Sequence, residues 1–212
     1  MECCKRYWIT VLPAEAKKIA ASRKESVSGF VEKNCLLQLQ LYPSDKKTGN
    51  PLVIPSNRVP KKFRKKIEKE LNGFSPFFLA LPTMVFKRAA NGSCEFLNQQ
   101  NGLCTIYESR PEQCQLFPFI PWNNKPLHSL YPFCAFLREK KPEGRYSDYG
   151  KAHYQKVAAY FNQVEKKGFL PVWKTVPKKG FLRLDQKPLG KISQKQFFSL
   201  LNPGLPATKT AR

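Results

Sequence analysis

The stretch "CEFLNQQNGLCTIYESRPEQC", which runs from Cys94 to Cys114, carries three cysteines at intervals of ten residues. Asn101-Gly102, between the first two cysteines, is a dipeptide typical of tight turns. The residues on either side of it are therefore predicted to form a short hairpin, with Cys94 and Cys104 close together at its base. A metal site, a disulfide framework and a chance spacing of three cysteines are all compatible with this pattern.

The residues that follow the hairpin predict the start of a helix. Ser109 can cap the helix, Pro111 suits its first turn, and Glu112 stands three residues after the serine, as in a capping box. Cys114 would lie in that first turn, where the helix dipole and the backbone amides lower the pKa of a thiol. A hairpin followed by a helix start can bring three thiolates together, and a fourth ligand would close a tetrahedral metal site.

Length and composition narrow the class of protein. The chain has 212 residues, enough for one domain with its own core, and its 42% hydrophobic content excludes wholesale disorder. Seven cysteines are too few for a disulfide scaffold, and an odd number cannot pair completely within one chain. The sequence shows no secretory signal and no apolar run of about 18 to 20 residues, the length of a membrane span. We therefore expect a cytoplasmic protein, because cysteine clusters in a reducing compartment more often bind metals.

The net charge of +22 favours polyanionic partners. A helix predicted from about Pro60 to Leu71 has a narrow apolar stripe and is otherwise strongly basic. A solvated surface explains such a helix, and so does a face that contacts the phosphates of a nucleic acid. The candidate phosphate-binding residues are Lys61, Lys62, Arg64, Lys65, Lys66 and Lys69.

The hydrophobic periodicity predicts both helices and strands. In the segment 35–43, leucines alternate with glutamines, as in a half-buried strand, and the segment 52–55 is expected to return as its partner. The region from Lys174 to Lys191 contains many charges and prolines and is predicted to be an extended appendage. The fold class predicted is α+β, a small metal-organised domain with short strands around the cysteine hairpin and about four helices. The four helices are expected near residues 13–25, 60–71, 149–167 and 193–201.

The cysteine stretch also resembles a known family. It resembles the signature of the YkgJ-type cysteine-cluster family in the pattern C-x-F-L followed by C-x-I-Y-x-x-R-P-x-x-C-x-x-F-P. The family is named for a CxxCxxCC-like pattern. Its members are described as candidate zinc- or iron-chelating proteins. "CCKRYWITVLPAEAKKIA" resembles the opening of that family, with its double cysteine at Cys3 and Cys4, and Cys134 fits a later family position. The resemblance covers roughly residues 1–137. It implies six candidate metal ligands: Cys3, Cys4, Cys94, Cys104, Cys114 and Cys134.

The resemblance leaves the metal and the number of ligands open. Four of the six thiolates would close one zinc site or one iron–sulfur cluster, and tetrahedral sulfur ligation suits both metals. The family pattern has further cysteines shortly before the double cysteine, whereas Met1 stands two residues before it. Arg110 is a candidate for a cation that contacts the cluster, because four thiolates around a divalent metal leave a net charge near −2. Cys35 matches no family position and is expected to be a small buried hydrophobic residue.

Three functions follow from these observations. The first is a metal-binding protein whose cysteine cluster has a structural role. The second is a nucleic-acid-binding protein with a structural metal, and the third is an iron–sulfur-dependent protein-modifying enzyme, although the sequence carries no catalytic motif. The expected division is a cysteine-cluster metal-binding domain over residues 1–137 and a basic helical extension over residues 138–212. The extension would pack on the same domain and end in a flexible tail, 202–212.

Overall fold

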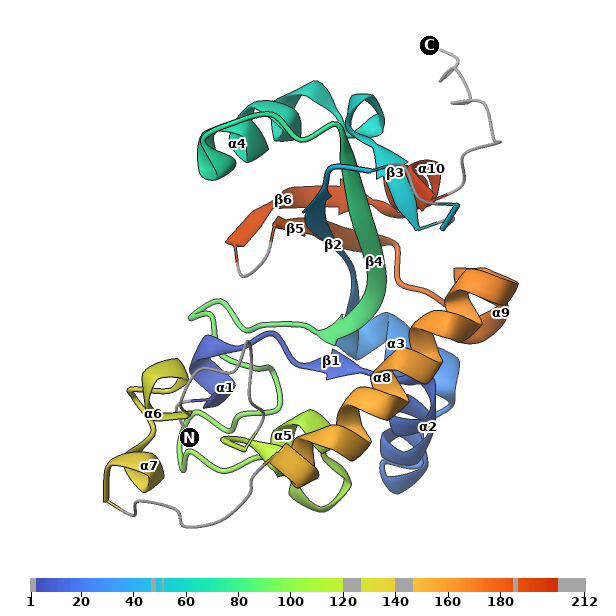
Figure 1. Cartoon of the computed structure of the whole chain (residues 1–212). Coiled ribbons are helices and arrows are strands. Elements are labelled where there is room, and N and C mark those ends of the chain that lie inside the picture. Colours follow the sequence, from blue (N-terminus) through green and yellow to red (C-terminus); the bar gives the residue numbers. More distant parts are fainter. Residues whose placement is uncertain are drawn as a thin grey trace. The chain divides into compact units, whose positions relative to one another are not determined.

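The chain divides into two compact units, each built from two separate stretches of sequence. Unit 1 combines Met1–Phe30 with Val85–Gln163, and unit 2 combines Val31–Met84 with Val164–Arg212. The computed structural model describes residues 3–46, 49–50, 52–119, 127–139, 147–184 and 187–201 (Figure 1). The tail 202–212 and the side chain of Cys3 lie outside the described part.

Unit 1 consists mostly of helices and loops. Its elements are α1 (Cys3–Arg6), β1 (Thr10–Val11), α2 (Pro13–Ser22), η2 (Tyr107–Ser109), α5 (Glu112–Leu116), α6 (Leu127–Leu130), α7 (Ala135–Glu139), the start of α3 (Val27–Asn34) and most of α8 (Ser147–Lys167). The predicted helix at Pro13 is confirmed, and Ala16, Ile19 and Ala20 form its buried face. The predicted helix 149–167 is confirmed as the greater part of α8.

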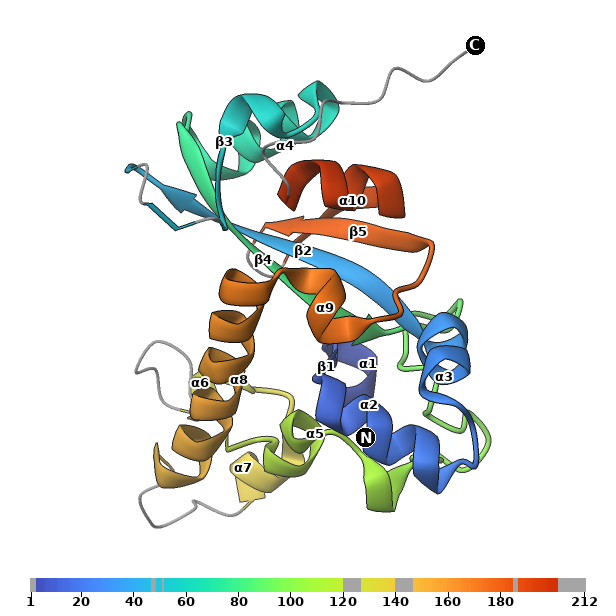
Figure 2. The ribbon, with the colours of Figure 1, turned by 90° about the vertical axis from the view of Figure 1, so that its right-hand side faces the viewer.

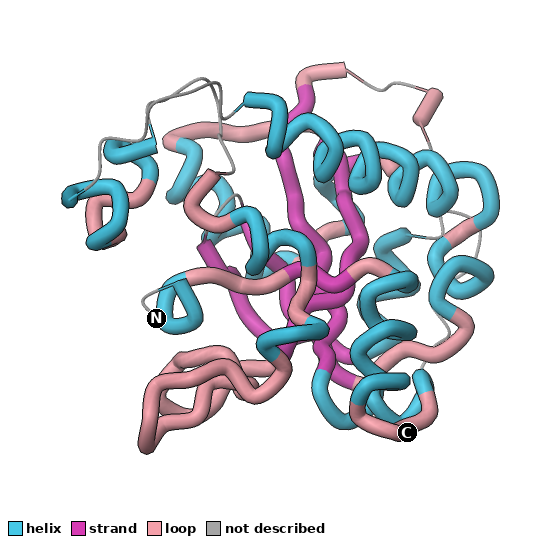
Figure 3. Tube along the Cα trace, turned by 90° about the horizontal axis from the view of Figure 1, so that it is seen from below, coloured by secondary structure: helices cyan, strands magenta, loops and turns pink. Residues whose placement is uncertain are grey.

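The cysteine-rich segment between Phe86 and Tyr107 contains neither a helix nor an extended strand and is drawn as loop in Figure 3. The turn at Asn101-Gly102 is present: the Gly102 amide donates to the Asn98 carbonyl at 2.9 Å, and Gly102 has a φ of +70°. The predicted hairpin is shorter than expected, because its two arms meet only in an isolated antiparallel bridge between Leu97 and Cys104.

Unit 2 is built around a mixed sheet. Its elements are β2 (Cys35–Ser44), β3 (Val53–Pro55), η1 (Ser56–Arg58), α4 (Lys61–Leu71), most of β4 (Phe77–Phe86), α9 (Phe169–Trp173), β5 (Lys179–Leu184), β6 (Lys187–Ser193) and α10 (Gln194–Leu201). The strand order is β4-β2-β5-β6, and β3 also pairs with β4. β2 and β5 are parallel, whereas β5 and β6 are antiparallel. The end of β4 that belongs to unit 1 pairs with β1.

Two strand assignments differ from the sequence prediction. The region Lys174–Lys191 is not an appendage, because it contains β5, an interior strand in which Phe181, Leu182 and Leu184 are buried. β3 pairs with β4 and not with β2, so the partner expected for the segment 52–55 was wrong. Both differences concern pairings between strands, which the hydrophobic pattern of a single segment does not specify.

β2 is buried more completely than the alternation of leucine and glutamine indicates. Leu37, Leu39 and Leu41 are fully buried, as predicted, but Gln38 is also only 1% exposed. The Gln38 side chain donates to the Thr83 hydroxyl at 3.2 Å and accepts from the Arg183 guanidinium at 3.3 Å. These bonds cross from β2 to both neighbouring strands, so the buried amide keeps its hydrogen bonds.

Helices cover the sheet of unit 2. α10 packs on β2, β5 and β6 and lies along β5 in Figure 2. It begins as predicted, since the Gln196 amide donates to the Ser193 hydroxyl at 3.2 Å. α4 packs on β6 through Phe63 and Ile67, and the Phe63 ring faces Gly190. The α+β class is thus confirmed, with a larger sheet and more helices, α1 to α10, than the four expected. No helix in the described residues is long and apolar enough to cross a bilayer.

Candidate metal centre

All six predicted ligands fall within unit 1, although they are spread over more than half of the sequence. Cys4 lies on α1, Cys94 and Cys104 lie in the loop segment, and Cys114 lies on α5. Cys134 directly precedes α7. Cys35, which was not predicted to bind metal, belongs to unit 2 and is fully buried on β2, as expected for a small hydrophobic residue.

A backbone contact joins the N-terminal cysteines to the loop segment. The amide of Cys94 donates to the carbonyl of Cys4 at 2.7 Å. The bridge between Leu97 and Cys104 then returns the chain toward Cys94, and the thiols of Cys94 and Cys104 are close enough to interact electrostatically. Cys94 and Cys104 therefore lie close together, as the hairpin prediction required, and the backbone of Cys4 lies beside that of Cys94.

The environment of Cys94 favours a neutral thiol when no metal is present. Burial raises the pKa of Cys94 to about 11, and the neighbouring Cys104 acts in the same direction. A hydrogen bond from the Phe96 backbone and the charge of Arg88 lower this pKa, but they do not outweigh burial. A thiolate at this position needs a cation in place of the proton, which a bound metal ion supplies.

Side-chain amides hold the loop around Cys94 in shape. Asn91 Oδ1 accepts from the Ser93 amide at 3.0 Å and from the Ser93 hydroxyl at 2.8 Å. Gln99 Nε2 donates to the same hydroxyl at 2.8 Å, and Asn91 Nδ2 donates to Gln99 Oε1 at 2.8 Å. This network connects the turn before Cys94 to the turn before Cys104.

An aromatic cluster brings the other cysteine segments together. Tyr7 and Phe117 each stand three residues after a predicted ligand, Cys4 and Cys114, and their ring centroids are 5.9 Å apart. Both rings pack against the cluster that buries Cys134, where Tyr131 is 5.8 Å from Tyr7 and 4.9 Å from Phe117. Packing of these rings thus places the segments of Cys4, Cys114 and Cys134 side by side.

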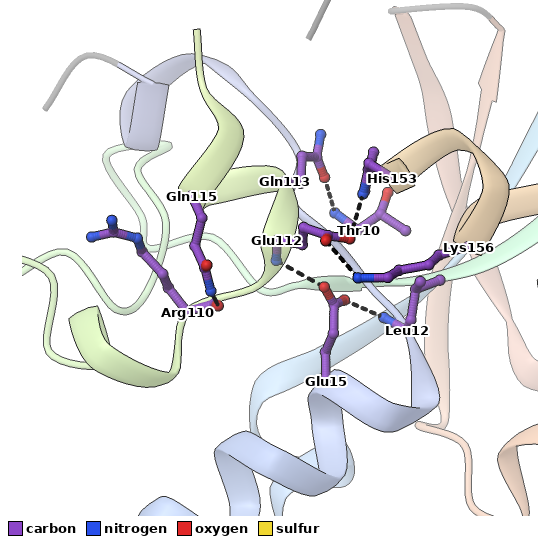
Figure 4. Close-up of polar contacts among 9 residues, drawn as sticks. All are labelled: Thr10, Leu12, Glu15, Arg110, Glu112, Gln113, Gln115, His153 and Lys156. Atoms are coloured by element: carbon purple, nitrogen blue, oxygen red, sulfur yellow. Dashed lines mark hydrogen bonds and ion pairs between the residues drawn. The ribbon is translucent and has the colours of Figure 1, made fainter. Parts of the chain in front are cut away.

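Arg88, which sequence reasoning missed, is a cation that lies beside two of the predicted ligands. Arg88 interacts electrostatically with Cys94 and Cys4, and burial, the largest influence, lowers its pKa from the ordinary value. Arg110, which was predicted for this role, places its guanidinium over the Tyr107 ring, 3.6 Å from the centroid, and its contact with a metal cluster stays a prediction. In Figure 4 the Arg110 side chain points away from the polar cluster between α2, α5 and α8.

The predicted capping box at the start of α5 is not formed. Ser109 does not cap α5, and its hydroxyl accepts from the Ser22 hydroxyl at 3.0 Å. The cap comes from α2: Glu15 Oε1 accepts from the Glu112 amide at 2.8 Å, and Glu15 Oε2 accepts from the Leu12 amide at 2.8 Å (Figure 4). One carboxylate therefore satisfies amides at the starts of two helices and fixes the helix that carries Cys114.

The carboxylate of Glu112 connects α5 to α8. His153 Nδ1 lies 3.2 Å from one carboxylate oxygen and Lys156 Nζ donates to the other at 2.6 Å (Figure 4). Burial alone would raise the pKa of Glu112, but the hydrogen bonds from Lys156 and His153 hold it below its usual range. A pocket of about 580 Å³ opens next to this cluster, between α2, α5 and α8, and Glu15, Lys18, Arg110 and Lys156 are among the residues that line it.

The described side chains do not form a closed chelate. Among them, no group of three or more His, Cys, Asp or Glu residues is placed to hold a metal ion. The donor chemistry nevertheless fits zinc or iron, since the region gathers thiols, one of them buried beside a second thiol and an arginine.

Comparison with known proteins gives one finding. The model of a family named CxxCxxCC, with the description "Putative zinc- or iron-chelating domain", matches residues 1–135. A comparison with curated proteins finds no match, and neither does a comparison with solved structures.

Proposed function

Because the chain belongs to the CxxCxxCC family, we propose that the cysteines of unit 1 bind zinc or iron and that the bound metal stabilises this unit. The observation that supports the proposal best is the convergence of four separate cysteine segments in one unit. The amide of Cys94 binds the carbonyl of Cys4, the Leu97–Cys104 bridge follows, and aromatic rings join the segments of Cys114 and Cys134. Unit 1 has few regular strands, so a metal would supply stability that its short helices lack.

The proposed ligands are drawn from Cys3, Cys4, Cys94, Cys104, Cys114 and Cys134. Four thiolates are enough for one tetrahedral zinc or iron ion or for one iron–sulfur cluster. Adjacent cysteines rarely bind one ion together, because their side chains diverge, so one of Cys3 and Cys4 is expected to be the ligand. The proposal includes a reducing compartment, the cytoplasm, where thiols stay available to a metal.

Metal content and a visible spectrum test this proposal directly. The full chain, purified without oxygen and without added chelator, is expected to carry about one metal ion or one cluster per chain. A colourless protein with zinc would indicate a structural site and contradict the iron–sulfur enzyme, whereas a brown protein with iron and inorganic sulfide would favour that enzyme. A protein without zinc or iron, which also fails to take up either metal after reduction of its thiols, would contradict the proposal.

Nucleic-acid binding through unit 2 is a second candidate function, favoured by the surface of α4. This helix buries Phe63 and Ile67 and exposes a row of lysines at positions Lys61, Lys62, Lys65 and Lys69. Phe74, which follows the helix, is 67% exposed. Proteins that bind single-stranded nucleic acid combine exposed aromatic rings, on which bases stack, with lysines and arginines that contact phosphates.

Charge reversal on α4 is expected to reduce both the affinity for single-stranded RNA and its salt dependence. The variant Lys61→Glu, Lys65→Glu, Lys69→Glu should flatten the slope of log affinity against log salt by about 2, because each lost phosphate contact contributes about 0.7. Fluorescence anisotropy at several salt concentrations measures this slope. The matched control is Lys151→Glu, Lys166→Glu, Lys167→Glu, which changes the net charge equally at exposed positions of α8. Equal effects of the two variants, or no binding by the wild type, would exclude this function for α4.

A further inference from the structure

We propose that Arg88 is a positioning residue of the metal centre: it holds the N-terminal cysteine helix against the Cys94 loop and provides a positive charge beside the thiolates. This inference rests on the proposed metal-binding function and extends it to a residue outside the cysteine pattern. Its structural basis is the contact of one guanidinium with three backbone carbonyls from two distant segments, residues 5–7 and residue 92.

The guanidinium of Arg88 fixes the end of α1. One terminal nitrogen donates to the Tyr7 carbonyl at 2.7 Å, and the other donates to the carbonyl of Lys5. α1 has only four residues, so bonds from outside the helix help to fix its position. Arg88 satisfies carbonyls at this end and thereby orients the helix that carries Cys3 and Cys4.

The same side chain also closes the loop that leads to Cys94. Nε of Arg88 donates to the Gly92 carbonyl, and the backbones of Arg88 and Cys94 meet in an isolated antiparallel bridge. Gly92 allows the tight turn, since its φ of +77° is in the left-handed region. The Trp8 ring, 5.2 Å from the guanidinium carbon, packs against the arginine. Arg88 therefore connects two cysteine segments that are about ninety residues apart in sequence.

The charge of Arg88 lies where a metal–thiolate centre needs it. Four thiolates around a divalent ion leave a net charge near −2, and a partly buried cation beside them offsets part of that charge. Arg88 interacts electrostatically with both Cys94 and Cys4. A lysine could keep the charge, but its single ammonium cannot reach three carbonyls in a fixed fork.

Zinc and cobalt binding by the full chain tests the role of Arg88. The variants are Arg88→Gln, Arg88→Lys and, as a matched control, Arg110→Gln, which removes an arginine that stacks on an aromatic ring in the same unit. Zinc affinity is measured by competition with a chromophoric chelator, and cobalt-loaded protein gives a spectrum that reports the thiolate geometry. The rate at which iodoacetamide modifies Cys4 in the reduced, metal-free protein, with modified positions identified by mass spectrometry, reports how firmly α1 is held.

Arg88→Gln is expected to weaken zinc binding about 10- to 100-fold, as other residues that contact metal ligands do. It should also shift the cobalt spectrum and speed the modification of Cys4. Arg88→Lys should weaken binding less, because it retains the charge, and Arg110→Gln should behave as the wild type. Wild-type affinity in Arg88→Gln, or an equal loss in Arg110→Gln, would overturn the inference while metal binding stands. A wild type that binds none of zinc, cobalt and iron would instead overturn the proposed function, and the inference about Arg88 with it.

Discussion

Replacing Cys104 with alanine is expected to remove most of the bound metal and to destabilise unit 1. The backbone bridge to Leu97 places Cys104 beside Cys94. The loss of the Cys104 thiol therefore leaves the hairpin with one thiol, that of Cys94. Structural zinc sites contribute about 10–16 kcal/mol of binding free energy to folding, and a site that loses one thiolate forfeits a large part of it. Elemental analysis and thermal unfolding measure the two effects, and Cys114→Ala and Cys134→Ala are expected to show them too.

The matched control for these variants is Cys35→Ala. Cys35 is fully buried on β2 in unit 2, so its replacement removes a buried thiol of the same size outside the proposed metal centre. Cys35→Ala should lower the stability modestly through lost packing and leave the metal content unchanged. Full metal content in Cys104→Ala would show that Cys104 is not a ligand, and metal loss in Cys35→Ala would show that the assay reports unfolding rather than ligation.

Local features of unit 1 could be predicted from the sequence where a short pattern determines them. Pro13 and the apolar spacing after it predicted α2, and Asn101-Gly102 predicted the turn between Cys94 and Cys104. The cap of α5 could not be predicted in this way. The carboxylate that accepts from the Glu112 amide belongs to Glu15, ninety-seven positions away. In the sequence, the nearby Ser109 matched the capping pattern, and nothing pointed to Glu15. A sequence motif within one segment does not reveal a hydrogen-bond acceptor that the tertiary fold brings from a distant segment.

The position of Arg88 shows the same limit. Arg110 stands within the cysteine motif, whereas Arg88 precedes it in "FKRAAN" and has no distinguishing sequence context. Only the folded backbone shows that carbonyls at the end of α1 and in the loop before Cys94 face the same guanidinium. The six cysteines themselves were recognisable because a family pattern links them, and the ligand set among them stays a prediction.

The sheet of unit 2 was the least predictable part of the fold. β2 pairs in parallel with β5 across more than a hundred residues, and a parallel pairing carries no turn signal. Lysines and prolines near β5 indicated an exposed segment, but the six residues of β5 itself include three large apolar side chains and Gly180. Gly180 lies opposite Leu37 of β2, so a substitution at Gly180 tests the register between β2 and β5.

The variant Gly180→Ala is expected to destabilise the protein by about 2 kcal/mol or more, because the new Cβ would meet the neighbouring strand. It would lie 2.6 Å from the Leu37 carbonyl oxygen and 2.6 Å from the Leu37 Cβ, and Leu37 is held in register opposite Gly180. Relief of this overlap requires β2 and β5 to separate, which costs hydrogen bonds in the middle of the sheet. Gly49→Ala is the matched control, since nothing lies within 4 Å of its added Cβ. Urea unfolding compares the variants, and a Gly180→Ala protein as stable as Gly49→Ala would contradict the pairing of Leu37 with Gly180.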